Sequence, residues 1–252
     1  MTEALAPGSL TGRRALVTGS SRGIGADTAK LLAAAGAEVY VNYRSKAPRA
    51  QKLVDEILAG GGAAHAVGAD LTDAESVAAF AATVAEGGPL DILVLNASGG
   101  MEAGMGEDYA MRLNRDAQVA FLSAMRPLLR HGSRVVFVTS HQAHFIRTTP
   151  TMPEYEPVAR SKRAGEDALR ALIPELEADG IGFVVVSGDM IEGTITATLL
   201  ERANPGAIAS RRESAGRLYN VGEFAREVAL AAIQPVPRDH TWYVGDTSDF
   251  AS

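Results

Sequence analysis

The stretch "VTGSSRGIG", residues 17–25, predicts the fold of this chain. It places Gly19, Gly23 and Gly25 between an apolar, strand-like segment and an alanine-rich segment of helical period. Glycines in such a turn let the backbone bend tightly and approach a pyrophosphate, which then lies at the N-terminus of the following helix. Because the strand precedes and the helix follows at the right spacing, the stretch predicts a dinucleotide-binding unit.

The rest of the chain alternates in the same way between strand-like and helical segments. Strands are expected at 14–19, 37–43, 63–70, 90–98, 134–140, 180–189 and 240–246, and helices at 25–36, 49–62 and 73–88. Three of the strands, at 90–98, 134–140 and 180–189, are nearly continuous apolar runs, as in strands covered on both faces. This alternation predicts an α/β fold, a Rossmann-type doubly wound parallel sheet with helices on both faces.

We expect a single domain over residues 1–252, because 46% of the residues are hydrophobic and no linker or repeat divides the chain. Stretches rich in Gly and Pro at 99–106 and 147–157 read as loops. Both follow the ends of apolar strands, which is where open α/β sheets bind their ligands.

Composition excludes several kinds of partner and site. The formal net charge is −6 without any basic block, which argues against nucleic acid. The chain has no cysteine, so disulfides, thiolate metal sites and cysteine nucleophiles are excluded. No apolar run reaches membrane-spanning length, and residues 1–14 lack an apolar signal core. We therefore expect a soluble cytoplasmic protein that does not bind membranes.

Further motifs follow the glycine turn in a fixed order. They are "GADLTD" at 68–73, "LVLNASGG" at 93–100, "MRLNRDA" at 111–117 and "VVFVTSH" at 135–141. Together with the TGxxxGxG spacing of the turn, this order resembles the short-chain dehydrogenase/reductase family over essentially the whole chain. Ser98 stands where that family usually has glycine.

The resemblance implies a set of cofactor-binding residues. Asp70 and Leu71 correspond to the pair that contacts adenine, and Asn96 lies in the turn after the fourth strand. The full implied set is Gly19, Ser21, Arg22, Gly23, Ile24, Gly25, Tyr43, Arg44, Ser45, Asp70, Leu71, Asn96, Ala97 and Lys162.

The end of the second strand distinguishes the two nicotinamide cofactors. A carboxylate there would accept hydrogen bonds from the 2′-hydroxyl of NAD and repel a 2′-phosphate. In "VNYRSK", residues 41–46, Tyr43 stands at about that position and Arg44 follows it, while Arg22 adds a second guanidinium from the glycine turn. Guanidinium groups match phosphate in charge and geometry, so NADP(H) is expected.

The stretch "MPEYEPVARSKRAGED", residues 152–167, contains the expected catalytic pair in an unusual arrangement. The resemblance implies a tyrosine four residues before the lysine, but Val158 stands there and offers no proton. The nearest tyrosine is Tyr155, seven residues before Lys162. Proline suits the first helical position and disfavours helical geometry before it, so Pro157 indicates that Tyr155 lies in the loop just before the helix.

The Tyr-x6-Lys spacing resembles the enoyl-acyl-carrier-protein reductase branch of the same superfamily. It implies an NADPH-dependent reduction of the C=C bond of an enoyl thioester or similar conjugated carbonyl, in which a phenol stabilises the developing enolate. One alternative is a carbonyl reductase in which Tyr155 protonates an alkoxide. A second alternative is a catalytically silent NADP(H)-binding sensor.

The implied catalytic set is completed by two residues outside this stretch. Ser140 ends the fifth strand and is expected to donate a second hydrogen bond, and Asn114 matches the helix asparagine of the family. The loop histidines His141 and His144 receive no role. Without a matching set of histidines, Asp189 and Glu192 are expected to be solvated loop acids, and no metal site is expected.

The resemblance also concerns the substrate and the assembly. The segment 190–220 is expected to cover a small-molecule substrate, which the enoyl interpretation makes an acyl thioester. A homotetramer or homodimer built on helix pairs is implied, with the helix of Lys162 among them.

Overall fold

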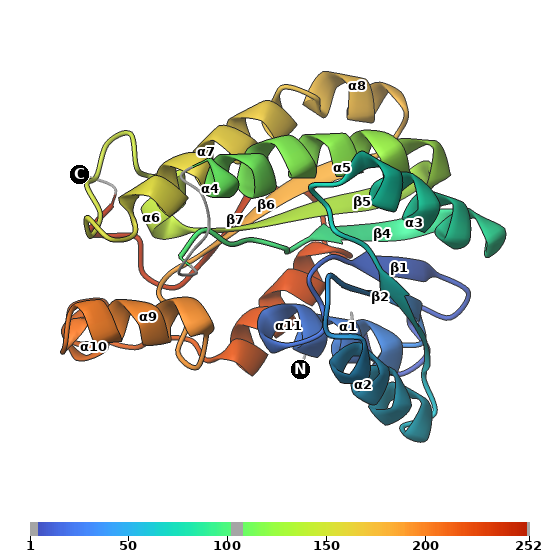
Figure 1. Ribbon diagram of the computed structural model, residues 1–252, viewed down its shortest axis with the longest axis horizontal. Coiled ribbons are helices and arrows are strands. Elements are labelled where there is room, and N and C mark those ends of the chain that lie inside the picture. Colours follow the sequence, from blue (N-terminus) through green and yellow to red (C-terminus); the bar gives the residue numbers. More distant parts are fainter. Residues whose placement is uncertain (1–4, 102–107, 251–252) are drawn as a thin grey trace.

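The protein is described by a computed structural model that covers residues 5–101 and 108–250 (Figure 1). In this part of the chain one seven-stranded, all-parallel sheet has the order β3-β2-β1-β4-β5-β6-β7. The strands are β1 Arg14–Val17, β2 Glu38–Tyr43, β3 Ala63–Gly68, β4 Leu90–Leu95, β5 Leu129–Ser140, β6 Gly182–Gly188 and β7 Thr241–Val244.

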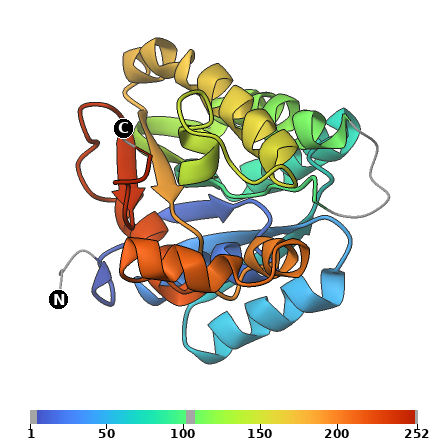
Figure 2. The same ribbon diagram turned by 90° about the vertical axis from the view of Figure 1, so that its left-hand side faces the viewer.

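Helices cover both faces of this sheet, and Figure 2 shows the three layers from the side. One face carries α1 Gly23–Ala34, α2 Ala47–Ala59 and α11 Val221–Ala231. The other carries α3 Ala74–Glu86, the short α4 Tyr109–Met111, a π-helical turn η2 at Arg112–Asp116, α5 Ala117–Met125, a 3-10 turn η3 at Arg126–Leu128, α7 Glu156–Arg170 and α8 Ile173–Ala178. At one end of the molecule lie α6 His141–His144, α9 Ile195–Ala203 and α10 Ala207–Ala215.

The alternation of strand side chains explains the two main layers of the core. Val17 and Val39 pack towards α1, α2 and α11, while Leu16 and Leu93 pack towards the helices of the opposite face. Successive side chains of a strand point to opposite faces, so a strand buried on both sides must be apolar throughout. The doubly wound parallel sheet predicted from the sequence is confirmed, with strand boundaries differing by a few residues.

The order of the strands reverses between β1 and β4, which are neighbours although β2 and β3 come between them in sequence. The connections therefore leave for opposite sides at this point. In an open parallel sheet, the crevice beyond the carboxyl ends of the strands at such a reversal is the usual ligand site. The glycine turn of residues 17–25 follows β1 and lies at this reversal.

Helix starts agree with local capping chemistry. Asp73, the expected cap, accepts a hydrogen bond from the Glu75 backbone N–H. Asn220 and Glu223 form a reciprocal capping box at the start of α11. Within residues 5–101 and 108–250, no helix has the length and apolar character that crossing a membrane requires.

Candidate active site

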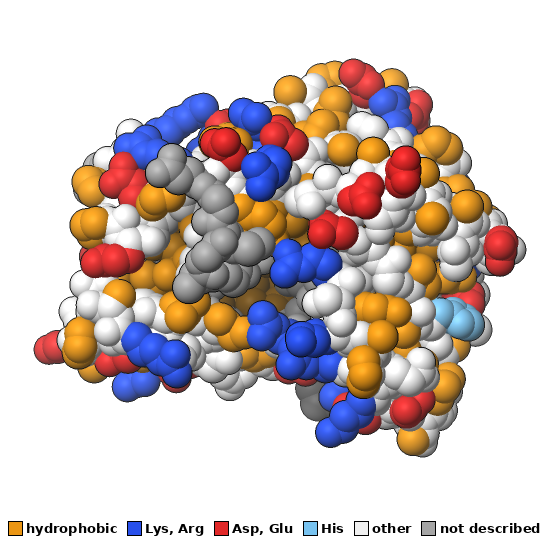
Figure 3. All heavy atoms as spheres, in the orientation of Figure 1, with side chains coloured by type: hydrophobic (Ala, Val, Ile, Leu, Met, Phe, Trp, Pro, Cys, Tyr) orange, Lys and Arg blue, Asp and Glu red, His pale blue; other side chains and the backbone are white. Residues whose placement is uncertain are grey.

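A cleft of about 700 Å³ opens at the carboxyl ends of the strands, where the strand order reverses. Its wall includes residues at or just after the carboxyl ends of strands β1 to β6, namely Gly19, Tyr43, Ala69, Asn96, Ser140 and Asp189. Figure 3 shows a hollow in this face of the molecule, with apolar side chains inside it and Lys and Arg side chains gathered at its rim. The cleft therefore combines a basic end with an apolar end.

The glycine turn forms one side of the cleft in the way that its spacing predicts. Gly19 and Gly23 adopt positive φ angles of +60° and +57°, a region that favours glycine. A Cβ at Gly25 would lie 2.6 Å from Asn96 Nδ2 and 2.9 Å from the Gly19 carbonyl oxygen, so this position admits no side chain. A Cβ at Gly23 would meet nothing within 4 Å, which leaves open space at the start of α1.

Buried hydrogen bonds fix this turn against the neighbouring strand ends. The Thr18 hydroxyl accepts hydrogen bonds from the backbone N–H groups of Asn96 and Ala97, at 2.9 and 3.0 Å. The Asn96 side chain donates to the Thr18 carbonyl at 2.9 Å, and the Asn42 side chain accepts from the Gly19 N–H at 3.0 Å. Thr18 is completely buried, so these bonds make the backbone of the turn rigid.

The basic end of the cleft lies beyond the second strand. Tyr43, Arg44, Ser45 and Arg22 line it as expected, and Lys46 and Arg49 line it as well, although no role was predicted for these two. Arg44 donates a hydrogen bond to the Tyr109 hydroxyl across the cleft. These four cations concentrate positive charge at one end, which suits a phosphate group.

Asp70 and Leu71 also line this end of the cleft. Burial raises the pKa of the Asp70 carboxyl, but hydrogen bonds from Thr72 and the charge of Arg44 outweigh it, so its pKa lies below the ordinary value. The carboxylate accepts from both the backbone N–H and the hydroxyl of Thr72, at 2.9 and 2.7 Å. Asp70 is therefore ionised and held in place at neutral pH.

At the opposite end of the cleft, Tyr155 and Ser140 form a hydrogen-bonded pair. The two hydroxyl oxygens are 3.0 Å apart, and both residues line the cleft. Tyr155 is only 4% exposed, so it is not a loose surface tyrosine. Ser140 also accepts a hydrogen bond from the Ala143 N–H at the start of α6, which orients its hydroxyl.

Tyr155 lies immediately before α7, as the sequence predicts. The helix begins at Glu156, however, so Pro157 is its second residue and the expected non-helical geometry of Glu156 is wrong. Proline is tolerated there because the first N–H groups of a helix have no intrahelical partner. Lys162 follows two turns later, is 9% exposed and lines the same cleft.

Val158 takes part in packing and is absent from the described wall of the cleft. It is 5% exposed and belongs to a third apolar cluster that also contains Tyr155, Met190 and Leu200. A Cβ at Gly100 would lie 3.2 Å from a Val158 methyl group. The position that usually carries the phenol is thus filled by a core side chain, while Tyr155 reaches the cleft from one turn earlier.

Asn114 does not line the described cleft, unlike the other predicted catalytic residues. Its side chain donates to Ser161 Oγ at 2.9 Å and to the Gly99 carbonyl at 2.8 Å, and it accepts from the Gly99 N–H at 3.2 Å. These bonds tie α7 and the loop after β4 to the π-helical turn η2. Asn114 therefore supports the wall that carries Lys162.

The π-helical turn also lets α7 approach closely. A Cβ at Gly165 would lie 1.9 Å from the Asn114 carbonyl oxygen, so only glycine fits on this face of α7. Such a bulge changes the direction of one carbonyl within a helix. Gly165 is one turn after Lys162, so the close approach of α7 to η2 lies next to the lysine.

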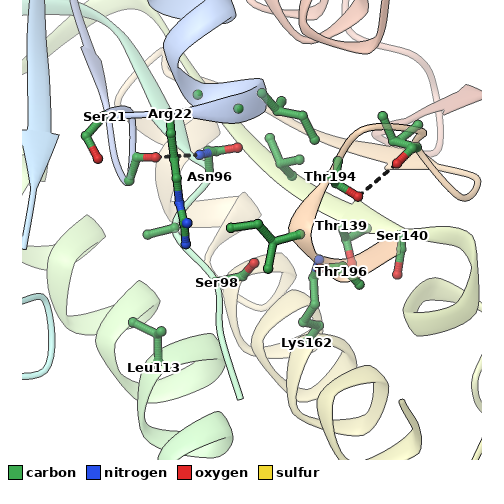
Figure 4. A pocket seen from close by; sticks show the side chains of 18 of the residues that line it. Ser21, Arg22, Asn96, Ser98, Leu113, Thr139, Ser140, Lys162, Thr194 and Thr196 are labelled. Atoms are coloured by element: carbon green, nitrogen blue, oxygen red, sulfur yellow. Dashed lines mark hydrogen bonds between the residues drawn. The ribbon is translucent and has the colours of Figure 1, made fainter. Parts of the chain in front are cut away.

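Several residues that line the cleft were not predicted from the sequence. Thr139 precedes Ser140, is 3% exposed, and its hydroxyl has no hydrogen-bond partner among the described residues. In the view of Figure 4, Thr139, Thr196 and Lys162 line one part of the cleft and Arg22 and Asn96 line another. A threonine at the end of a strand gives no signal in one sequence, whereas Arg49, three residues after Lys46, could have been noticed as a continuation of the basic run.

The acidic residues after β6 are ion-paired, so the prediction that both Asp189 and Glu192 are solvated is wrong for Asp189. Asp189 is 3% exposed and accepts two hydrogen bonds from Arg211, at 2.9 and 3.0 Å. Glu192 is partly exposed and pairs with Arg212. The sequence could not reveal these pairs, because the partners lie on α10, about twenty residues later. No cluster of three or more His, Cys, Asp or Glu residues within the described chain is arranged to hold a metal ion.

The two loop histidines lie outside the described wall of the cleft. His141 is completely buried, with Nδ1 at 2.8 Å from Ser187 Oγ. Burial, together with the charges of His144 and Arg211, lowers the pKa of His141 to about 4, so it is neutral at physiological pH. His144 contacts the buried carboxylate of Glu166 at 2.9 Å. Both histidines are the end residues of α6, so the expectation that they lie on a loop is wrong.

The chain matches the family model described as short chain dehydrogenase over residues 13–204. It is 38% identical over 172 residues to a hydroxynaphthalene reductase-like protein, Arp2, from Metarhizium robertsii, in a match that covers 66% of this chain. The chain spans 63% of the length of that relative.

Solved structures with the same fold include a short chain dehydrogenase from Burkholderia cenocepacia in complex with NADP. It is 32% identical, with a TM-score of 0.78 over 96% of this chain and 99% of that one. LugOII, a promiscuous reductase described as catalysing keto-reduction at C1 during lugdunomycin biosynthesis, is 28% identical, with a TM-score of 0.76 over 89% and 91% of the two chains. None of the three proteins named here is described as an enoyl reductase.

Proposed function

Because the chain belongs to the short-chain dehydrogenase family, we propose that it is an NADPH-dependent reductase of carbonyl groups. The observation that carries this proposal is the pair of hydroxyl groups of Tyr155 and Ser140, 3.0 Å apart in the same cleft as Lys162. Two converging hydroxyls suit a single oxygen atom of a substrate. Further support comes from LugOII, which is described as catalysing keto-reduction, and from Arp2, which is described as hydroxynaphthalene reductase-like.

The residues of the cleft fit an NADP(H) molecule. The start of α1 has Arg22 at its N-cap without a side-chain cap hydrogen bond in the described structure, so its first N–H groups are available to a pyrophosphate. Arg22 and Arg44 suit the 2′-phosphate, and Asp70 with Leu71 suits the adenine. A carboxylate at the position of Tyr43 would repel the 2′-phosphate of NADP(H) and so favour NAD; the uncharged Tyr43 does not. The NADP complex of the Burkholderia relative supports the same assignment.

When bound, NADPH supplies the hydride for the carbonyl carbon. As the C=O bond becomes a C–O single bond, the oxygen gains the charge and needs a proton. Tyr155 donates that proton through its hydroxyl, while Ser140 holds the oxygen by a hydrogen bond. Lys162 places a positive charge in the same cleft, which favours the phenolate that forms. Asn114 keeps the helix of Lys162 in position.

Reduction of a C=C bond is the second candidate, and the Tyr-x6-Lys spacing favours it. In that reaction the hydride would add to the β-carbon of an enoyl thioester and Tyr155 would stabilise the enolate oxygen. Both reactions place charge on a single oxygen, so the Ser140–Tyr155 pair suits either of them. The relatives favour the carbonyl reaction, because LugOII is described as catalysing keto-reduction and Arp2 as hydroxynaphthalene reductase-like. We therefore rank the carbonyl reaction first, reversing the order that the spacing alone suggests.

A catalytically silent NADP(H)-binding sensor is a third candidate, since Val158 occupies the usual position of the phenol. The burial of Tyr155 and its bond to Ser140 argue against it, because lost chemistry would not need this arrangement. A homodimer or homotetramer that uses α7, and a cytoplasmic location, are also proposals that follow from the family resemblance.

The test follows NADPH absorbance with the purified protein and three substrates in parallel. These are a bicyclic aryl ketone, a β-ketoacyl thioester and an enoyl thioester. We expect turnover of at least one ketone and little turnover of the enoyl compound. Turnover of the enoyl thioester alone would replace the proposal by the second candidate, and tight NADPH binding without turnover of any of the three would favour the sensor.

A further inference from the structure

The segment 190–220, here called the covering segment, forms the wall of the cleft next to Tyr155. Met190, Ile195 and Thr196 line the cleft from the loop after β6 and the first turn of α9, and Leu200 lines it from the next turn. The chain then turns into α10 and returns to the body at Asn220. Figure 2 shows α9 and α10 side by side in front of the sheet. The position of this segment therefore determines the shape of the substrate end.

The two helices of the covering segment are held in different ways. α9 buries Ala197 and Leu200 in the apolar cluster that contains Tyr155 and Val158. None of the described residues 207–215 of α10 is buried, although Ile208 and Ala215 touch the edge of that cluster. A helix without a buried apolar face gains little from packing, so α10 depends on other contacts to remain in place.

Arg211 makes the most buried ion pair of α10 among the described residues. Its Nε lies 2.9 and 3.0 Å from the two carboxylate oxygens of Asp189, directly after β6. The same guanidinium donates to the Asp246 carbonyl at 3.1 Å, pairs with the Asp249 carboxylate and lies over the Phe250 ring. One side chain thus joins α10 to the end of β6 and to the C-terminal loop.

Burial distinguishes this pair from the neighbouring one on the same helix. The side chains of Arg211 and Asp189 are 11% and 1% exposed, whereas those of Arg212 and Glu192 are 53% and 33% exposed. Burial by itself lowers the pKa of Arg211. The hydrogen bonds to Asp189 and the charges of Asp189 and Asp249 raise the pKa by more than burial lowers it, so it lies above its ordinary value. A desolvated pair is screened less by salt and is costly to break on one side, while an exposed pair contributes little.

Asp189 is also well placed to act on the cleft. It lines the cleft, and its Oδ1 accepts a hydrogen bond from the Met190 N–H at 2.7 Å, which fixes the first turn of the covering segment. Its own N–H donates to the Val244 carbonyl at the end of β7. The carboxylate therefore connects Arg211 to the backbone that begins the wall of the substrate end.

We propose that Asp189 and Arg211 are positioning residues, and that their ion pair holds the covering segment against the substrate end of the cleft. Their loss weakens substrate binding by letting α10 and the start of α9 move away, while the cofactor end and the Tyr155–Ser140 pair stay unchanged. The expected effect on turnover rests on the proposed carbonyl reduction, but the effect on the covering segment does not.

The first test measures hydrogen exchange by mass spectrometry in the intact protein, comparing wild type with Arg211→Met and Arg212→Met. We expect amides of residues 195–215 to exchange roughly tenfold faster in Arg211→Met, with the rest of the protein unchanged. Arg212→Met, the matched control on the same helix, should exchange within about twofold of wild type. Equal exchange in both variants would overturn the proposal.

The second test measures steady-state kinetics with the best ketone substrate. In Arg211→Met, KM for the ketone should rise by roughly tenfold, while kcat and the Kd of NADPH change by no more than about twofold to threefold. Arg211→Lys keeps the charge and should recover part of the loss in KM. A fall in kcat with unchanged KM, or an equal weakening of NADPH binding, would show that the pair does not act on the substrate end.

The proposal can still be tested if no ketone is reduced or if Arg211→Met does not fold. If no ketone is reduced, the proposed function fails, and the exchange experiment alone decides on the positioning role. If Arg211→Met does not fold, Asp249→Asn removes only the outer, exposed partner of Arg211. That variant should still raise exchange in residues 195–215, by a smaller factor, and unchanged exchange would count against the proposal.

Discussion

The two ends of the cleft are built in different ways. At the cofactor end, the backbone of the glycine turn forms the wall, and bonds from Thr18, Asn42 and Asn96 lock it. At the substrate end, side chains from β5, α7 and the covering segment meet, and an ion pair to a distant helix holds one of the walls. The cofactor end is therefore determined by local backbone shape, and the substrate end by long-range contacts.

This difference accounts for which part of the site departs from the family pattern. A turn that must bring its N–H groups to a phosphate tolerates few side chains, as the close approach at Gly25 shows. A hydroxyl that must reach a substrate oxygen can come from any nearby element. Tyr155 reaches the cleft from the residue before α7, and Val158 fills the core instead. The position of the catalytic hydroxyl at the substrate end can therefore change, while the backbone of the glycine turn at the cofactor end stays the same.

The largest effect is expected at the relocated tyrosine. Tyr155→Phe removes the proton donor and should lower kcat by roughly 10²- to 10⁴-fold, as loss of a general acid does, without changing the Kd of NADPH. Steady-state kinetics and fluorescence titration with NADPH measure the two quantities.

The double variant Tyr155→Phe/Val158→Tyr tests whether a tyrosine at the usual position of the phenol can replace Tyr155. Because Val158 packs into the core and not against the described cleft, a tyrosine there should not restore activity. Recovery to near the wild-type rate would mean that the ordinary position still serves the reaction and that Tyr155 has another role.

The next effect concerns the rigidity of the cofactor end. Thr18→Val leaves the N–H groups of Asn96 and Ala97 without their acceptor, which should lower the free energy of unfolding by about 3 kcal/mol. Urea unfolding measures it. Thr18→Ser keeps the hydroxyl and should lose less than half as much; equal losses in the two variants would show that the hydroxyl does not hold the turn.

A smaller effect separates the two cofactors. Arg44→Ala combined with Arg22→Ala should raise the Kd of NADPH by roughly ten- to a hundredfold, since each removes a charged partner of the 2′-phosphate. The Kd of NADH, which lacks that phosphate, should change by less than about threefold. Arg160→Ala, at an exposed site on α7, is the control and should alter neither value. An equal loss for both cofactors would move these arginines away from the 2′-phosphate.

The smallest effect is a pH dependence of the free energy of unfolding that comes from the buried His141. The folded state lowers the pKa of His141 from 6.5 to about 4, so the unfolded chain binds more protons between these two pH values. Stability from this group is complete above pH 6.5 and is lost as the pH falls towards 4. Between pH 7.5 and pH 5.0 the loss should be about 2 kcal/mol.

Urea unfolding at the two pH values measures this loss. His141→Gln should show a smaller difference between them, because its side chain does not titrate. The exposed His65→Gln should behave like wild type. The same pH difference in His141→Gln and in wild type would mean that another group causes the acid sensitivity.

Much of the site was predictable because its signals are local. The glycine turn at Gly19, Gly23 and Gly25 was predicted from its spacing, and Ser140 and Lys162 were predicted from the family resemblance. All five residues line the same cleft. The helix starts at Glu156, one residue earlier than predicted, because proline is tolerated at the second position of a helix, where the N–H has no intrahelical partner. Asn114 was expected to be catalytic, and this role stays a prediction; in the structure its side chain joins α7 to the loop after β4.

The sequence by itself determined the parallel sheet, the glycine turn and the basic end of the cleft, because strand period, glycine geometry and charge act over a few residues. The tertiary structure decided the rest. It placed the Tyr155 hydroxyl against Ser140, the Thr139 hydroxyl in the cleft wall and Asp189 against Arg211. These contacts join residues that only the packing of helices on the sheet brings together, and no spacing along the chain encodes them.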